Sequence, residues 1–80
     1  MFCVYIIRSE SRPDQTYVGF TENLKQRLAT HNQGGSPHTA KFAPWRLEFY
    51  CAFRSKNKAL AFERYLKSHS GKAFASKRLL

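Results

Sequence analysis

The six residues from Phe2 to Ile7 (Phe-Cys-Val-Tyr-Ile-Ile) constrain the fold most, because nearly all of them are β-branched or aromatic. Such a run favours a strand that is buried on both faces. A chain of 80 residues has room for one domain with one small core. We therefore expect this strand to lie at the centre of its sheet, with other elements covering both sides.

The next segments predict a hairpin followed by a helix. Residues 9–15 contain Ser, Arg, Pro and Asp, which favour a turn, and residues 16–20 then form a second strand. Thr21 is a reasonable N-cap for a helix that runs through His31 and ends at Gly34 and Gly35.

The middle of the chain predicts a loop and a third strand. Residues 32–44 contain two glycines and two prolines, which indicates a long loop of the kind that often carries function. Residues 46–53 alternate well enough for a strand that places Leu47, Phe49 and Cys51 on one side.

The last third of the chain predicts two helices. Ser55 caps a helix that ends near His69, and Gly71 terminates it. A short final helix covers residues 72–80, with Phe74 as its anchor. The element order ββαβα(α) predicts an α+β fold, in which helices flank a small three-stranded antiparallel sheet within a single domain, residues 1–80.

Composition excludes several classes of protein. Hydrophobic residues at 42% and aromatic residues at 15% are too frequent for a disordered tail. No apolar run approaches the ~20 residues of a transmembrane helix, and no secretory signal is evident. We expect a soluble, cytoplasmic protein without a membrane partner, in which Cys3 and Cys51 remain reduced.

The charge is large and unevenly distributed. Fourteen Lys and Arg residues against five Asp and Glu residues give a net charge of +9. Residues 1–40 carry four basic and three acidic side chains, whereas residues 41–80 carry ten basic and two acidic ones. A basic surface of this size favours a polyanionic partner, with nucleic acid ahead of anionic membrane. The alternative is a solvated face that serves only solubility.

Three polar side chains break the apolar pattern of the two main helices. Arg27 and His31 lie within about 60° of Leu24 on a helical wheel, so they flank the buried stripe of the first helix. Glu63 lies about 40° from Ala59 on the second helix. The alternatives are an arginine whose stem covers the core and a simple pair of Glu63 with the lysine four residues later.

The two predicted hairpin strands add phenols to this set. Tyr5 and Tyr17 lie on neighbouring strands, and Gly19 lies two residues after Tyr17, where its missing side chain leaves space for a ligand. Two such tyrosines are often only packed rings. Together with an arginine, a histidine and one carboxylate in a basic domain, they suit phosphodiester chemistry: a carboxylate for a divalent cation, a guanidinium for phosphoryl oxygens, and a phenol or imidazole for protons.

The spacing of these residues resembles that of the GIY-YIG nuclease superfamily. Val4-Tyr5, Tyr17-Val18-Gly19, Arg27 and Glu63 follow the family's order over nearly the whole chain. The chain most resembles the short stand-alone members, and more distantly the nuclease domain of the excision-repair incision enzyme. Cys3 stands where the first motif glycine is found, and Phe20 stands where some relatives have a lysine.

The resemblance implies a DNA endonuclease that uses one metal ion and is directed by DNA structure rather than sequence, as in DNA repair. Its catalytic residues would be Tyr5, Tyr17, Arg27, His31 and Glu63. Glu63 would hold Mg²⁺ or Mn²⁺, Arg27 would bind the non-bridging oxygens, and either tyrosine, assisted by His31, would pass on the proton of the attacking water. Which tyrosine, or His31, is the general base stays open at this point.

Further residues are expected to hold the nucleic acid. They are basic, polar or small side chains around the expected site: Gly19, His38, Lys41, Arg46, Lys67 and Lys72. A homodimer or a protein partner would set specificity in so small a nuclease. The alternative function is a catalytically silent module on the same fold that binds DNA or RNA.

Overall fold

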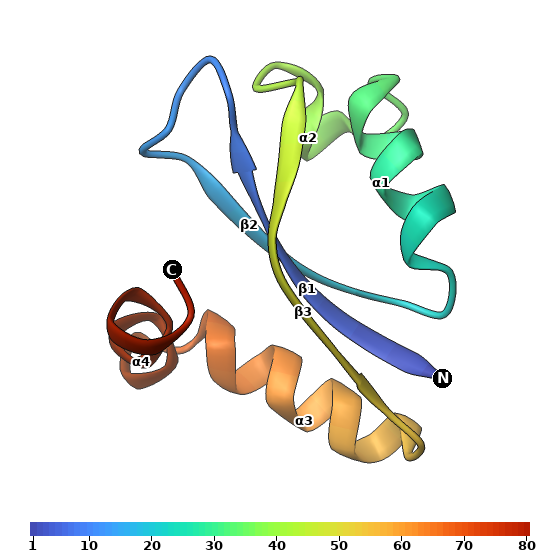
Figure 1. Cartoon of the computed structure of the whole chain (residues 1–80), viewed down its shortest axis with the longest axis vertical. Helices are drawn as coiled ribbons and strands as arrows, with labels where there is room; N and C mark the ends of the chain where they lie inside the picture. The colour runs from blue at the N-terminus through green and yellow to red at the C-terminus, as the bar shows by residue number, and fades with distance from the viewer.

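The computed structural model describes all 80 residues and contains a three-stranded sheet with helices on both sides (Figure 1). The elements in chain order are β1 (Phe2–Ser9), β2 (Thr16–Thr21), α1 (Leu24–Asn32), α2 (Pro37–Ala40), β3 (Trp45–Phe53), α3 (Lys56–Lys67) and α4 (His69–Arg78). Both pairings are antiparallel and the strand order is β2-β1-β3. The predicted α+β class and the central position of the first strand are confirmed.

The two faces of β1 belong to two different clusters. Side chains alternate between the faces of a strand, so Val4 and Ile6 face α3 and α4, where Ala59, Leu66 and Ala75 complete an apolar core. Tyr5 and Ile7 face the opposite way and pack with residues of α1 and with Trp45. Figure 1 shows α1 and α2 on one side of the sheet and α3 and α4 on the other.

A β-bulge in β3 corrects the expected pattern of that strand. Ile6 pairs with Phe49, but Ile7 pairs with Leu47, so Glu48 is an extra residue opposite β1. A bulge moves the residues before it to the other face. Leu47 consequently packs with the Tyr5 cluster and Phe49 with the apolar core. Their expected placement on one side was wrong, because strict alternation does not anticipate an inserted residue.

The start of α1 and the following segment differ from expectation. The N-cap is Asn23, whose side chain accepts a hydrogen bond from the Gln26 amide at 3.1 Å, whereas Thr21 accepts one from the Asn23 amide. Residues 32–44 are not wholly loop, because Pro37 begins the short helix α2. Proline suits the first turn of a helix, where its missing N–H has no intrahelical partner.

Gly71 does not end a helix as expected. Ser55 caps α3 as predicted, but α3 ends at Lys67, and the Ser68 side chain caps α4, which contains Gly71. A Cβ atom on Gly71 would lie 1.7 Å from the Tyr65 carbonyl oxygen, so this glycine permits the close approach of α4 to α3. Phe74 is 37% exposed, and the buried residue that anchors α4 is Ala75.

No helix of the structure is both long and apolar enough to cross a membrane. Cys3 and Cys51 are free thiols, as expected.

Candidate active site

A buried chain of hydrogen bonds lies between β1, α1 and α2. His31 is completely buried, and both of its ring nitrogens have partners. Its Nε2 is 2.8 Å from the Tyr5 hydroxyl, and its Nδ1 is 2.7 Å from the Thr39 hydroxyl. Tyr5 and Thr39 are each 1% exposed. The site therefore begins with a polar chain inside the protein rather than on its surface.

The carboxyl end of α1 is held to β3 by Asn32. Its side-chain oxygen accepts a hydrogen bond from the Trp45 amide at 2.5 Å, and its nitrogen donates to the Trp45 carbonyl at 3.2 Å. The Trp45 indole in turn donates to the Thr39 carbonyl at 2.9 Å. These bonds fix α1, α2 and β3 relative to one another and so place His31 between Tyr5 and Thr39.

Gly19 has a different purpose from the one expected. It lies opposite Tyr5 in the β1–β2 ladder, and a Cβ atom there would lie 2.3 Å from the Tyr5 hydroxyl oxygen. The expected open space for a ligand is therefore wrong, because the Tyr5 phenol fills it. Gly19 is needed so that this phenol can cross the neighbouring strand and reach His31.

Tyr17 joins the buried chain to the carboxyl end of α3. Its ring is 5.2 Å from the His31 ring in an edge arrangement, and the Lys67 ammonium lies 5.6 Å from its centroid. Tyr17 is only partly buried, in contrast to Tyr5. Of the two phenols, Tyr17 is the one that is accessible from outside.

Arg27 interacts electrostatically with Tyr5 and His31. Burial raises the pKa of Tyr5, while hydrogen bonding and charge from Arg27 oppose that rise. The Tyr5 phenol oxygen, as acceptor, raises the pKa of Arg27. Burial, and secondly the charge of Arg27, lower the pKa of His31. At neutral pH the structure thus holds a protonated phenol, a neutral imidazole and a guanidinium together.

Glu63 lies on α3, with 21% of its side chain exposed. It forms an ion pair of 3.3 Å with Lys67 at i+4, so the simple helical pair is present. Burial is the main cause of the raised pKa of Tyr5, and the charge of Glu63 also contributes to it. No group of three or more His, Cys, Asp or Glu residues is arranged to hold a metal ion. A lone carboxylate suits Mg²⁺, which usually keeps several waters and takes its remaining oxygens from substrate phosphate.

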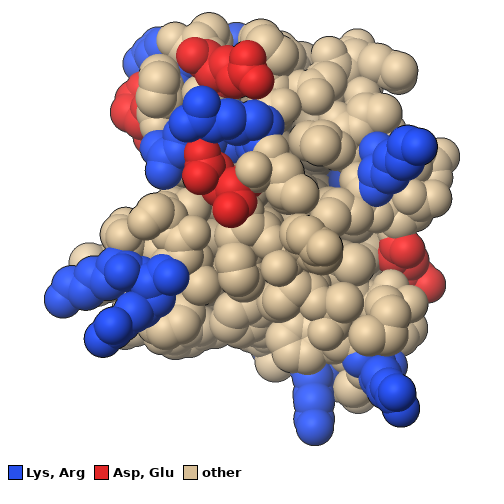
Figure 2. Space-filling view, in the orientation of Figure 1, with Lys and Arg blue, Asp and Glu red and all other residues tan.

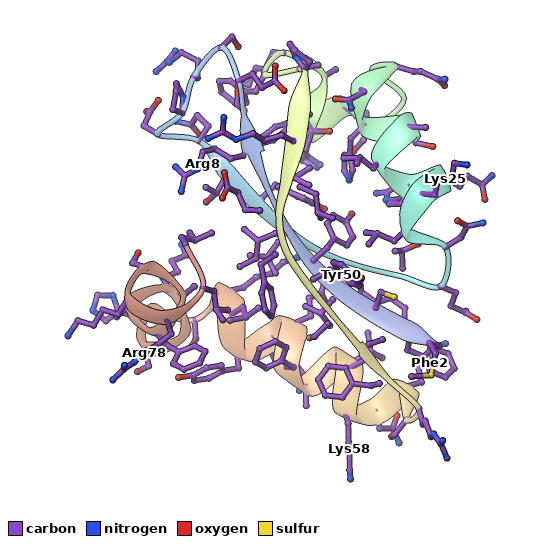
Figure 3. The ribbon with its side chains drawn as sticks, in the orientation of Figure 1. Phe2, Arg8, Lys25, Tyr50, Lys58 and Arg78 are labelled. Carbon is purple, nitrogen blue, oxygen red and sulfur yellow. The ribbon has the colours of Figure 1, made fainter.

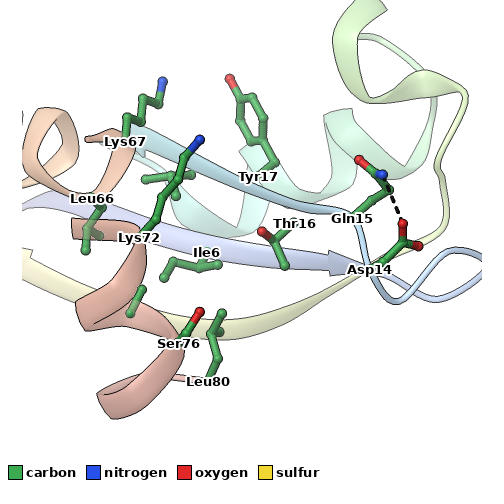
Figure 4. Close-up of a pocket in the computed structure, with 12 residues that line it drawn as sticks. Ile6, Asp14, Gln15, Thr16, Tyr17, Leu66, Lys67, Lys72, Ser76 and Leu80 are labelled. Atoms are coloured by element: carbon green, nitrogen blue, oxygen red, sulfur yellow. Dashed lines mark hydrogen bonds between the residues drawn. The ribbon is translucent and has the colours of Figure 1, made fainter. Parts of the chain in front are cut away.

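A pocket of about 560 Å³ lies beside Tyr17, between β2 and α4 (Figure 4). Ile6, Val18 and Leu66 contribute apolar surface, while Lys67 and Lys72 supply cations to its lining. Figure 4 shows the side chains of Tyr17, Lys67 and Lys72 at one side of this pocket. The two predicted nucleic-acid contacts on α3 and α4 are therefore brought next to the phenol.

The other predicted contacts lie apart from this cluster. His38 and Lys41 are exposed at α2, and the Lys41 ammonium lies over the Phe42 ring at 5.3 Å. Arg46 forms an ion pair of 2.9 Å with Glu48, which also pairs with Arg8. Arg46 lies on β3, across β1 from Tyr17, so the structure does not bring it to the site.

The basic side chains differ in their surroundings. Figure 2 shows acidic groups beside basic ones near the β1–β2 turn, whereas basic groups over α3 and α4 stand without acidic neighbours on this face. Figure 3 shows Arg8 near that turn, with Lys58 and Arg78 pointing away from the sheet. The uncompensated charge thus belongs to the second half of the chain, as its composition indicated.

Thr39 has a different role from the one that the sequence suggests. With His38 and Lys41 it was expected in a loop beside the cleft, where it would help to hold the strand, but it is buried and bonded to His31. It stands in a segment with glycines and prolines on either side, which carries no periodic pattern. The one available signal was Pro37, which favours a helical first turn two residues earlier. Nothing in the sequence indicates that this turn folds back onto His31.

Comparison with known proteins places this arrangement in a family. The profile of the GIY-YIG catalytic domain matches residues 1–78. The solution structure of the UPF0213 protein BH0048 from Bacillus halodurans is similar with a TM-score of 0.58 and 30% identity, covering 99% of this chain and 87% of that one. This fold and this set of side chains define a GIY-YIG catalytic domain, and the chain belongs to the GIY-YIG family.

Two groups of proteins have sequences similar to that of this chain. A UPF0213 protein of Lacticaseibacillus paracasei is 46% identical over 52 residues, which cover 64% of this chain and 58% of that protein. The structure-specific endonuclease subunit SLX1 of Debaryomyces hansenii is 43% identical over 72 residues, and the SLX1 homolog of Giardia intestinalis is 38% identical over 66 residues. These alignments cover 79% and 78% of this chain but only 20% and 18% of the SLX1 proteins.

Proposed function

We propose that this chain is a divalent-metal-dependent endonuclease that hydrolyses phosphodiester bonds in DNA and selects its substrate by shape rather than by sequence. The observation that supports this proposal is the position of Lys67, whose ammonium lies 5.6 Å from the Tyr17 ring centroid and 3.3 Å from the Glu63 carboxylate. The name of the SLX1 relatives, structure-specific endonuclease subunit, supports both the reaction and the choice by shape.

The guanidinium of Arg27 binds the non-bridging oxygens of the scissile phosphate. Its planar donors suit two oxygens at once, and they also stabilise the charge that develops during attack. Lys67 and Lys72 hold phosphates of the same strand along the pocket beside Tyr17. Because the pocket contributes apolar surface as well as cations, it suits a nucleotide next to the cut.

Tyr17, rather than Tyr5, passes on the proton of the attacking water. Burial keeps the pKa of Tyr5 above its ordinary value, and its hydroxyl is already bonded to His31. Tyr17 is partly exposed and lies between the His31 ring and Lys67. Tyr5 and His31 therefore support the site from inside, while Tyr17 and Arg27 contact the reacting groups.

Glu63 is the residue that would hold Mg²⁺ or Mn²⁺. Such a cation supplies charge neutralisation at the phosphoryl oxygens and a polarised water. Lys67 must then exchange its bond with Glu63 for one with DNA phosphate. Binding of the metal ion by Glu63 is thereby coupled to binding of the substrate strand by Lys67.

A second copy of the chain, or another protein, would contribute to substrate choice. The word subunit in the SLX1 names supports a protein partner, and the small size of this domain leaves little surface for reading DNA shape. A DNA substrate also implies an intracellular setting.

The test is cleavage of labelled single-stranded, duplex, flap and four-way DNA with Mg²⁺, Mn²⁺ or EDTA. We expect cutting that needs metal, is absent in Glu63→Gln and falls about 10²–10³-fold in Arg27→Ala. Glu22→Gln, an exposed carboxylate far along the chain from α3, is the matched control and should cut normally. Full activity in Glu63→Gln would overturn the assignment, and salt-sensitive binding without any cutting would favour the silent module.

A further inference from the structure

Thr39 has no role in the proposed chemistry, yet it is buried and bonded to the histidine at the centre of the site. Its hydroxyl lies 2.7 Å from His31 Nδ1 and 3.4 Å from the Ser36 carbonyl oxygen. Three hydroxyl and imidazole groups therefore form one chain, from Tyr5 through His31 to Thr39. Such a chain has two possible directions, because each hydroxyl and each ring nitrogen can donate or accept.

The inner end of the chain fixes one direction. A carbonyl oxygen only accepts, so the Thr39 hydroxyl donates to Ser36 and has only its lone pairs left for His31. His31 Nδ1 must then carry the proton and donate it to Thr39. Because burial and Arg27 keep the ring neutral, Nε2 is left without a proton and accepts one from Tyr5.

The outer end of the chain fixes the same direction independently. The Tyr5 side chain is 1% exposed, and the hydrogen-bond partner of its hydroxyl is His31 Nε2. A buried hydroxyl hydrogen needs an acceptor, so it points at His31 Nε2, 2.8 Å away. If Nε2 carried the proton instead, the buried hydrogen of the Tyr5 hydroxyl would have no acceptor.

We propose that Thr39 is a positioning residue that fixes His31 as the Nδ1–H tautomer and so makes the buried Tyr5 hydroxyl the donor to Nε2. The direction of the Tyr5 hydroxyl in the site is thereby set by a bond chain that starts at the backbone carbonyl of Ser36, the N-cap of α2. The effect on cleavage rests on the proposed function, whereas the tautomer itself does not.

The backbone of Thr39 is held without its hydroxyl, which makes the test clean. Its amide donates to the Ser36 carbonyl at 3.1 Å, and its carbonyl accepts from the Trp45 indole at 2.9 Å. Thr39→Val keeps these bonds and the shape of the side chain but removes the acceptor for Nδ1–H. Thr39→Ser keeps the hydroxyl and is the matched control.

The first measurement is the ¹⁵N chemical shifts of the His31 ring in the labelled chain. We expect the wild type and Thr39→Ser to show a protonated Nδ1 and a bare Nε2, and Thr39→Val to lose this preference. A wild type with protonated Nε2 overturns the proposal, as does a Thr39→Val ring identical to the wild type. The fluorescence of Trp45, the single tryptophan, reports whether Thr39→Val folds; if it does not, the wild-type shifts still decide.

The second measurement is cleavage of the best DNA substrate by the same three proteins. Thr39→Val leaves the buried Nδ1–H of His31 without an acceptor, which corresponds to about a tenfold fall in kcat/KM, and Thr39→Ser should restore the rate. Equal rates in wild type and Thr39→Val overturn the link between the tautomer and cleavage. If no protein cuts any DNA while the shifts are as expected, the proposed function fails and the tautomer assignment stands.

Discussion

The two faces of the sheet are built on opposite principles. On the face toward α3 and α4, Val4 and Ile6 pack with aliphatic side chains and no buried polar side chain is involved. On the face toward α1 and α2, the neighbouring residue Tyr5 forms a buried hydrogen bond, and the cluster continues through His31 and Thr39. Adjacent residues of one strand thus serve an apolar core and a polar site.

This division teaches where the fold obtains its stability. Apolar burial stabilises in proportion to area, whereas a buried hydrogen bond adds little net stability but is costly to leave unmade. The α3 face therefore holds the sheet together, and the α1 face uses that rigidity to fix the directions of its donors and acceptors. Every buried side-chain nitrogen and oxygen has a partner, so the polar face is fully satisfied.

The largest expected effect is the loss of stability when the apolar face is disrupted. Leu66 is 1% exposed in the apolar core, so Leu66→Ala should lower the free energy of unfolding by about 2–5 kcal/mol. Urea unfolding followed by Trp45 fluorescence measures this loss. Leu80→Ala is the matched control, because Leu80 is 41% exposed. A Leu66→Ala loss no larger than that of Leu80→Ala would refute the division of labour.

The apolar face was largely predictable from the sequence, and the polar face was not. Phe2 to Ile7 identified the central strand, and helical spacing correctly placed Arg27 toward the sheet. These patterns are local and periodic. The role of Thr39 and the bulge at Glu48 depend on how distant segments meet, so no local pattern contains them.

Glycines show the same limit. Gly71 was expected to end a helix and Gly19 to leave room for a ligand, because both interpretations use only neighbouring residues. In the structure each glycine instead admits a distant group: the Tyr65 carbonyl at Gly71 and the Tyr5 phenol at Gly19. Sequence indicates that a side chain is missing, but only the fold shows what occupies its place.

A smaller loss of stability is expected when the polar face is disrupted. Gly19→Ala forces the Tyr5 phenol away from β2 and from His31, and overpacking of this kind costs about 1–3 kcal/mol. The ring is buried and hydrogen-bonded, so it has little freedom to move. Unfolding free energies of Gly19→Ala, Tyr5→Leu and the double variant measure the coupling. We expect the Gly19→Ala cost to shrink in the Tyr5→Leu background; strict additivity would show that Tyr5 is not the obstacle.

The smallest expected effect is a pH dependence of the unfolding free energy that comes from His31 on the polar face. The pKa of His31 is lowered from its ordinary 6.5 by burial and by Arg27. Just below pH 6.5, His31 therefore binds a proton in the unfolded chain but not in the folded chain. Stability that His31 contributes is therefore present above about pH 6.5 and lost as pH falls below it, by at most about 1.4 kcal/mol per pH unit. His31→Gln should remove this slope, as measured by urea unfolding between pH 7.5 and 5.

Glu48 changes the unfolding free energy in a lower pH range than His31 does. Hydrogen bonding to Arg46 lowers the pKa of the Glu48 carboxyl below its ordinary 4.5, so its contribution is lost only at lower pH. A slope between pH 6.5 and 5 that disappears in His31→Gln but persists in Glu48→Gln therefore belongs to the buried chain. If the full pH slope of the unfolding free energy remains in His31→Gln, protonation of His31 is not its cause. The folded chain would then not hold the imidazole neutral, and the tautomer assigned through Thr39 would be refuted.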